Sequence, residues 1–420
     1  MSDIPFAPET WADKSNYKYM KEFGTMGVDW EQRVDFARMR RERVEKAKDA
    51  LAASEADALF VCRHEDARYL TGYRVQYGPV ASVSLPPVVL PKGEDPILYT
   101  GDWRFENMPW MGERMLKEGR HHNAYKNTFE FAKSVKKQVP KLSGKCVIGL
   151  DLVNMKLLKE YQQAFPGAEF VDGYAILQKA KVIKTKDEQE CERQAAIITE
   201  AGMDAGYRAL KNAGLRECEV LGDIWKVCFS LGGEWTQTGG TVCSGTYTWR
   251  HPLITTDRII KKGDLVVIDI GSCFNGYWGD FTRTWICGED MEPTDEQIDL
   301  HQEAYDAQFA SNDAMRAGNT TYDVFKAGRT PHGWPGGHGC GMHCWEEPFL
   351  SSSPETAQVL EPGMLADPST YAWIPGVGGV ACENQVFVTE GDPEIITTYP
   401  FEERLIRKFH PMDKRRMRRK

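Results

Sequence analysis

The pattern of hydrophobic and polar positions changes near residue 180. Before that point, short apolar runs alternate with charged stretches of helical spacing. They predict a helix over Trp30–Leu51 and strands at Ala56–Cys62, PPVVLP, DPILYT and CVIGLD. After it, long amphipathic stretches are combined with strands that read as largely antiparallel. We therefore predict an α/β first domain over residues 1–180, an α+β second domain over 181–406 and a basic tail over 407–420.

The second domain is expected to open with a long helix. Thr185 and Glu188 have the spacing of a capping box, in which two side chains satisfy the first free amides of a helix. Apolar residues then recur at helical spacing through Leu210. Further helices are predicted over Glu217–Leu231 and Pro293–Arg316, with β-rich segments between them and at the end.

One predicted hairpin carries two aspartates. The apolar run Leu265–Ile270 reads as a strand, and Asn275-Gly276 favours a two-residue turn because both residues tolerate positive φ. That register places Gly271 opposite Asp280, with Asp269 on the same face. Two close carboxylates repel unless a cation lies between them. The hairpin therefore indicates either a metal site or a solvent-facing turn with two scattered acids.

Three more segments hold side chains suited to metal binding. The stretch HGWPGGHGCGMHCWEEP contains His338 among glycines, which let the backbone approach a site closely. Asp367 in GMLADPS and Glu383 in VACENQVFVT lie in or beside apolar, strand-like runs. A buried carboxylate needs a partner, and a metal ion is one.

Overall composition narrows the class of protein. The chain is 41% hydrophobic and 27% charged, with a formal net charge of −9. This acidic balance argues against a nucleic-acid partner, and no apolar run approaches the length of a membrane helix. The N-terminus has no signal-peptide pattern. We therefore expect a cytoplasmic protein without a membrane partner, in which the eleven cysteines are reduced.

Taken together, these segments resemble the "pita-bread" family, which includes methionine aminopeptidases, Xaa-Pro aminopeptidases and dipeptidases, and creatinase. The resemblance covers roughly residues 180–405, and the first half resembles the N-terminal domain of the creatinase and prolidase branch. It implies a homodimer and two divalent ions, of manganese, cobalt, iron or zinc, that activate water for attack on a C–N bonded carbonyl. The metal ligands that it implies are Asp269, Asp280, His338, Asp367 and Glu383. It further implies that His251 contacts the substrate or the reacting group.

The chain departs from the family pattern at two positions. Asp367 stands where the family usually has glutamate, and Trp345 stands where its peptidases have a histidine. His343 lies two residues before Trp345, and on a strand it would face the same side. We therefore predict that His251 and His343 are the catalytic histidines; alternatively, His343 only packs near the site.

These departures leave several functions open. We expect a metal-dependent hydrolase of C–N bonds similar to Xaa-Pro peptidases, acting on a dipeptide or another small molecule. A second hypothesis is a creatinase-like hydrolase or a lyase similar to the iron enzyme that cleaves dimethylsulfoniopropionate, and a third is a non-catalytic binding module. Aromatic faces attract cations, so the candidate substrate contacts are Trp345, Trp249, Tyr247 and Trp278. Each of these rings could instead belong to the core.

Overall fold

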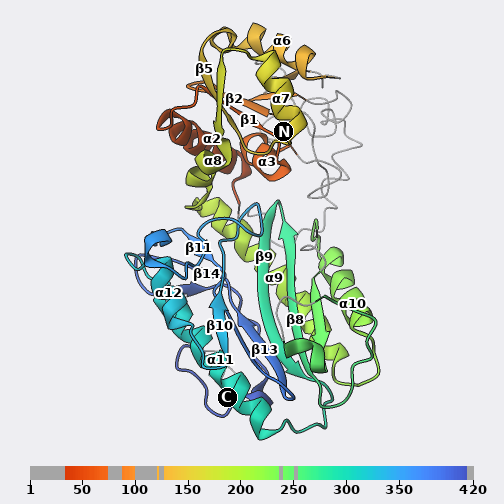
Figure 1. Cartoon of the computed structure of the whole chain (residues 1–420). Helices are drawn as coiled ribbons and strands as arrows, with labels where there is room; N and C mark the ends of the chain where they lie inside the picture. The colour runs from red at the N-terminus through yellow and green to blue at the C-terminus, as the bar shows by residue number, and fades with distance from the viewer. Residues whose placement is uncertain are drawn as a thin grey trace, which may run out of the picture. The chain divides into compact units, whose positions relative to one another are not determined.

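The computed structural model divides into two compact units, Met1–Lys181 and Val182–Lys420, and each is described here by itself (Figure 1). The structure describes residues 34–73, 88–99, 121–122, 127–235, 240–249 and 254–413. Within these ranges, no helix combines the length and the apolar character that a membrane crossing requires.

The first unit is a mixed sheet covered by helices. Its strands, in the order β4-β3-β2-β1-β5-β6, are β1 (Ala58–Val61), β2 (Val88–Pro91), β3 (Ile97–Tyr99), β4 (His121–His122), β5 (Cys146–Leu150) and β6 (Ala168–Asp172). Its helices are α2 (Phe36–Ala52), α3 (His64–Thr71), α6 (Thr128–Gln138), α7 (Met155–Ala164) and α8 (Gly173–Lys181). Strand β1 pairs in parallel with β5 and antiparallel with β2. The predicted α/β character is confirmed.

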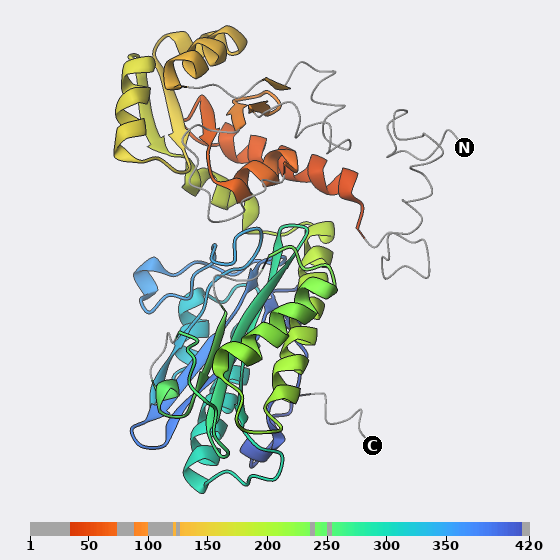
Figure 2. The ribbon, with the colours of Figure 1, turned by 90° about the vertical axis from the view of Figure 1, so that its right-hand side faces the viewer.

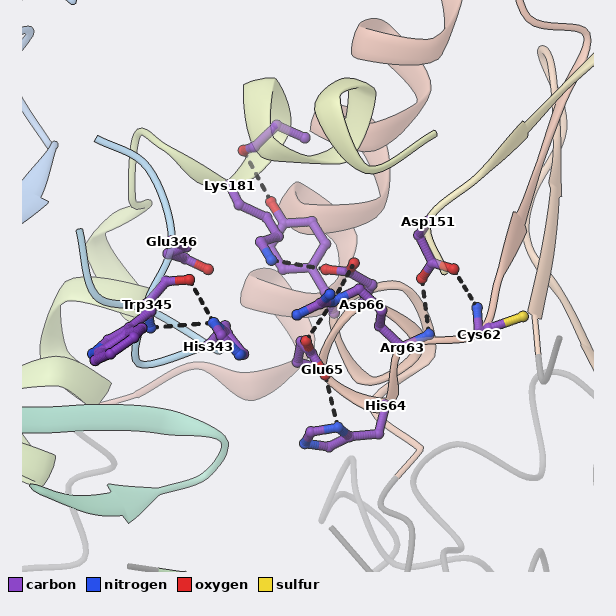
Figure 3. A network of polar contacts seen from close by, with 12 residues as sticks. Cys62, Arg63, His64, Glu65, Asp66, Asp151, Lys181, His343, Trp345 and Glu346 are labelled. Carbon is purple, nitrogen blue, oxygen red and sulfur yellow. Dashed lines mark hydrogen bonds and ion pairs between the residues drawn. The ribbon is translucent and has the colours of Figure 1, made fainter. Parts of the chain in front are cut away.

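Side chains at the start of α2 and α3 explain where these helices begin. Asp35 accepts a hydrogen bond from the amide of Arg38 at 2.9 Å, so α2 begins at Phe36, later than the predicted Trp30. Residues 30–33 lie outside the described part of the chain. The Asp151 carboxylate accepts the amides of Cys62 and Arg63 at 2.7 and 2.9 Å, just before α3 (Figure 3).

The second unit contains four longer helices and nine strands within the described residues. The helices are α9 (Lys186–Ala209), α10 (Glu217–Ser230), α11 (Asp295–Ala314) and α12 (Thr321–Ala327). The strands are β7 (Thr241–Ser244), β8 (Leu265–Phe274), β9 (Tyr277–Ile286), β10 (Gly333–Gly336), β11 (Leu365–Ala366), β12 (Ser369–Ile374), β13 (Gly378–Glu383), β14 (Val386–Phe387) and β15 (Glu394–Ile395). The capping box predicted at the start of α9 is confirmed, because Thr185 and Glu188 bond each other's backbone amides.

Two antiparallel sheets form the frame of this unit, β7-β8-β9 and β10-β12-β13. Helices α9 and α10 lie on the side of the first sheet (Figure 2). Their packing includes Ile224, Ile268 and Phe281. Helix α11 packs on the second through Tyr305 and its neighbours. The α+β prediction for this half is therefore confirmed, and one face of each sheet remains for the candidate site.

The predicted hairpin is confirmed in register and in turn. Asn275 and Gly276 have φ values of 51° and 91°, as a two-residue turn of this type requires. Gly271 lies opposite Asp280, and Asp269 lies opposite Thr282. Asp269 and Asp280 are therefore diagonal neighbours on one face of the sheet.

Gly279, next to Asp280, lets helix α9 approach strand β9 closely. A Cβ atom at this position would lie 2.6 Å from the backbone carbon and oxygen of Ala195. We expect Gly279→Ala to lower the free energy of unfolding by about 1–3 kcal/mol, because backbone atoms must move apart. Gly222 in α10 is the control: its Cβ would meet nothing within 4 Å. Gly222→Ala should stabilise by about 0.5–1 kcal/mol. Denaturant unfolding of both variants checks the pair, and equal effects would contradict this packing argument.

Candidate metal centre

Two groups of side chains in the second unit have metal-binding geometry, and they share one residue. The first is Asp280, His338 and Asp367; the second is Asp269, Asp280 and Glu383. In each group the candidate ligand atoms all lie within 4.8 Å of one another. The structure therefore brings together all five residues for which the sequence predicts metal ligation.

Asp280 stands at the centre of this arrangement and is 1% exposed. Burial raises the pKa of its carboxyl well above the ordinary value, and the charges of Glu383 and Asp269 raise the pKa further. A cation would reverse this preference, because it favours the ionised form. Because Asp280 belongs to both groups, its carboxylate would help to hold an ion in either one.

The imidazole of His338 is suited to bind a metal ion as a neutral ligand. Burial lowers the pKa of its imidazole to about 4, so the ring is uncharged at neutral pH. Its Nδ1 lies 3.2 Å from the carbonyl oxygen of Gly339, which can accept a hydrogen bond from the Nδ1-protonated tautomer. Nε2 then keeps the lone pair that a metal requires.

The two remaining acids come from the second sheet. Asp367, two residues before strand β12, is fully buried. Burial raises the pKa of its carboxyl, and a hydrogen bond from the Cys340 thiol opposes that shift. Its carboxylate lies 3.8 Å from Nδ1 of His338. Glu383, at the end of β13, accepts a hydrogen bond from Thr282 at 2.9 Å. Several buried acids this close together fit a divalent cation, whose positive charge would offset theirs.

The segment around His343 differs from the prediction. It is not a strand: Gly339 and Glu346 bond each other's backbone at 2.8 and 3.0 Å, and the residues between them form bends. Strand alternation therefore does not place the side chains of residues 343 and 345 on the same side. His343 Nδ1 instead lies 3.1 Å from the backbone nitrogen of Trp345 (Figure 3). The indole of Trp345 is 59% exposed, and its centroid lies 5.4 Å from that of His338.

The other candidate site residues fall into three situations. His251 lies outside the described residues. Tyr247 and Trp249 are exposed on the short helix η4 (Gly245–Trp249). Trp278 is 4% exposed and packs in an apolar cluster with Cys273 and Cys340, so its indole belongs to the core.

Further residues near the centre were not singled out from the sequence. Tyr371 shares a small hollow with Val267 and Ala381, and burial and the charges of Glu383 and Asp269 raise the pKa of its hydroxyl. In the sequence, Tyr371 is simply a tyrosine four residues after Asp367. Its place beside the carboxylates becomes clear only from the strand pairing, which turns its side chain towards them.

A buried ion pair anchors the segment that carries His338. Lys184 Nζ lies 3.0 Å from Glu346 Oε1, and both side chains are 1% exposed. Glu192, on α9, is fully buried and has no hydrogen-bond partner among the described residues. Burial raises its pKa, and Lys184 opposes that shift. No sequence signal marks Glu192, since α9 is charged along much of its length.

Both halves of the chain match models of known protein families. Residues 190–390 match the model of metallopeptidase family M24, and residues 43–183 match the creatinase/prolidase N-terminal domain. The chain belongs to the M24 metallopeptidases. It is thus a peptidase-type, metal-dependent hydrolase of the branch that also contains creatinase and the Xaa-Pro peptidases.

Several relatives resemble this M24 protein along nearly their whole length. An Xaa-Pro dipeptidase of Pyrococcus furiosus is 25% identical over 372 residues, which cover 85% of this chain and 98% of that protein. Among solved structures, an Xaa-Pro dipeptidase from Bacillus anthracis aligns with a TM-score of 0.72 at 23% identity, covering 87% and 99% of the two chains. Dipeptidase PepE from Mycobacterium ulcerans aligns with a TM-score of 0.74 at 23% identity, covering 88% and 98%. These structures share its fold.

Proposed function

We propose that this M24 protein hydrolyses the C–N bond of small substrates, with Xaa-Pro dipeptides as the first class to test, at a centre that holds two divalent metal ions. The observation that carries this proposal is the pair of ligand groups joined at Asp280. When bound, two such ions would supply an activated water and polarise the scissile carbonyl. The sequence-similar Xaa-Pro dipeptidase supports the substrate class.

We assign the roles of individual residues as follows. Asp269, Asp280 and Glu383 hold one ion, and Asp280, His338 and Asp367 hold the other. Thr282 fixes Glu383 through its hydroxyl group. His251 is proposed to contact the substrate, and His343 to assist it from the exposed side of His338. Manganese, cobalt, iron and zinc all suit oxygen-rich ligation with one imidazole.

Trp345 is proposed to narrow the range of substrates. Its exposed indole borders His338 at the position where the family's peptidases carry a histidine. Tyr247 and Trp249 add further exposed aromatic surface in the same unit. Aromatic faces favour small cationic groups. The exposed ring of Trp345 beside His338 supports the second candidate function, a creatinase-like hydrolase or a lyase that acts on a small cationic metabolite.

A substrate panel with two Trp345 variants separates these candidates. We expect Trp345→His to raise kcat/KM for Xaa-Pro dipeptides by about tenfold or more, because an imidazole that holds or transfers a proton contributes strongly to such reactions. Trp345→Phe keeps an aromatic ring without an imidazole and should leave dipeptide turnover unchanged. Steady-state assays with and without a chelator check both. Equal substrate preference in all three proteins would count against a role for Trp345.

We further propose that the enzyme is a cytoplasmic homodimer. All eleven cysteines are free thiols in the structure, which suits a reducing compartment. The resemblance to prolidases supports the dimer, and sedimentation of the purified full chain should give twice the mass of one chain.

A further inference from the structure

Two of the candidate metal ligands lie where the chain passes from one sheet to another. Asp367 lies between β11, of the sheet β11-β14-β15, and β12, of the sheet β10-β12-β13. Glu383 ends β13, and three residues later the chain enters β14, so it returns to the first of these sheets. At such a crossing the backbone leaves the regular hydrogen-bond ladder of a sheet. The position of each carboxylate therefore depends on contacts from other elements as well.

A buried side chain from strand β9 supports the crossing at Glu383. Arg283 is fully buried and donates from Nη1 to the carbonyl oxygen of Glu383 at 2.6 Å. It also donates from Nη2 to Oδ1 of Asn384 at 2.9 Å. These two bonds fix the residues with which this crossing begins.

The crossing at Asp367 is supported in the same way from helix α11. Nε2 of Gln308 donates to the carbonyl oxygen of Pro368, the residue after Asp367, at 2.7 Å. A carbonyl oxygen only accepts hydrogen bonds, so it is the amide nitrogen that must face it. The same nitrogen donates to Oδ1 of Asn312, one helical turn later, at 2.8 Å. Asn312 therefore fixes the orientation of the Gln308 amide.

These two amides lie in the interior of the unit. Gln308 and Asn312 are fully buried, and Oε1 of Gln308 and Nδ2 of Asn312 have no hydrogen-bond partner among the described residues. A buried amide that is only partly satisfied is less favourable than an apolar side chain of the same size. What Gln308 offers in place of such a side chain is therefore its bond to Pro368.

This bond matters because the ligand that it supports is an aspartate. Aspartate has one methylene and one rotatable bond fewer than the glutamate that the family usually has at this position. Its carboxylate follows the backbone closely, since no additional rotamer can absorb a backbone shift. The amide of Asp367 donates to the carbonyl oxygen of His338 at 2.7 Å, and Gln308 holds the next carbonyl group. The backbone is thus fixed on both sides of the ligand side chain.

We propose that Gln308 is a positioning residue for the metal ion that His338 and Asp367 share in the proposed centre. Its amide fixes the carbonyl group of Pro368 and thereby sets how far the Asp367 carboxylate reaches. Mutation of groups that orient metal ligands typically weakens metal binding by about 10–100-fold. The inference rests on the proposed two-metal centre, but it does not depend on which substrate this centre hydrolyses.

The experiment uses the full chain, with zinc as the probe and ¹⁵N labels in the histidine side chains. His338 belongs to only one of the two ligand groups, so its ring resonances report on the ion shared with Asp367. The signals that are missing in His338→Asn identify them. A chelator buffer sets the concentration of free zinc, and plasma mass spectrometry counts the zinc bound per chain.

Gln308→Met keeps the approximate size of the side chain and removes the amide donor. We expect this variant to need about tenfold more free zinc than the wild type for half-saturation of the His338 resonances. It should still bind the other ion at the free zinc concentration that the wild type requires. Asn312→Leu leaves Gln308 in place but removes the acceptor that orients it, and should weaken zinc binding at His338 several-fold.

Phe309→Leu is the control for a general loss of stability. Phe309 lies on the same helix, is buried and packs against Tyr305 and Phe401, with ring centroids 4.9 and 5.8 Å away. This variant should lower the midpoint of denaturant unfolding and leave zinc binding at His338 unchanged.

Three results would overturn the inference: unchanged zinc affinity at His338 in Gln308→Met, equal weakening of both ions in that variant, or an equal effect of Phe309→Leu. A wild-type protein that binds no zinc at His338 would overturn the proposed metal centre together with this inference. Selective loss of zinc from Gln308→Met in a protein that hydrolyses no dipeptide would support the inference and contradict only the proposed substrate class, because zinc binding is measured without substrate.

Discussion

Asp280→Asn is expected to abolish hydrolysis and metal binding while leaving the metal-free protein folded. Because Asp280 belongs to both ligand groups, its loss affects both ions at once. Metal ions of this kind contribute several kcal/mol to catalysis, so kcat/KM should fall by about 10³-fold or more. Metal content, measured per chain by plasma mass spectrometry, should drop together with activity.

The same variant has a distinctive effect on stability. In the wild-type protein, saturating metal should raise the free energy of unfolding by about 2.7 kcal/mol at a concentration 100 times Kd. Asp280→Asn should lose most of this increase. Without metal, the variant should be as stable as the wild type or more stable, because it removes one acid from a buried acidic cluster. Lower stability of the metal-free variant would indicate a purely structural role.

The second large effect that we expect is that bound metal reverses the pH dependence of the free energy of unfolding. Burial raises the pKa of Asp280, Asp367 and Glu383 in the folded protein, and the charges of neighbouring carboxylates raise it further. Carboxyl groups in the unfolded chain have pKa values of about 4. Between that pH and the raised folded pKa values, the folded state binds more protons than the unfolded state. The stability from these groups is thus complete below pH ~4 and is lost as pH rises.

Chelated protein is therefore expected to be less stable at pH 8 than at pH 5. Metal binding releases those protons, so added metal should stabilise more strongly at pH 8 than at pH 5. Denaturant titrations at both pH values, with chelator and with metal, give the four free energies. Chelated Asp280→Asn is the control and should show a weaker pH dependence. A chelated protein that gains stability up to pH 8 would contradict this account.

Local sequence signals were sufficient for the parts of the fold that depend on near neighbours. The capping box at Thr185, the Asn275-Gly276 turn and the register that pairs Gly271 with Asp280 follow from short-range geometry, and all are present. The segment after His338 was predicted less well. The backbone of this segment folds back on itself at Glu346. The side chain of Glu346 bonds to Lys184, which lies 162 residues earlier in the chain. No local pattern could show that contact.

The same distinction applies to the candidate site. The family resemblance was sufficient to identify five potential metal ligands, even though Asp367 stands in place of a glutamate. Tyr371 and Glu192 could not be found this way, because their importance comes from sheet pairing and helix packing rather than from a motif. Trp278 shows the opposite error: proximity in sequence to Asp280 suggested a substrate contact, whereas the side chain packs in the core.

Arg283 sets a limit on when the centre can form during synthesis. It donates to the backbone oxygen of Glu383, 100 residues later, and to that of Tyr399, 116 residues later. A ribosome synthesises the chain from its N-terminus, so the guanidinium of Arg283 has both acceptors only after Tyr399 has emerged. The hairpin with Asp269 and Asp280 is made early, but its ligand partners come last. A nascent chain that stops between Glu383 and Tyr399 therefore carries all five candidate ligands without the Tyr399 carbonyl that helps to fix Arg283.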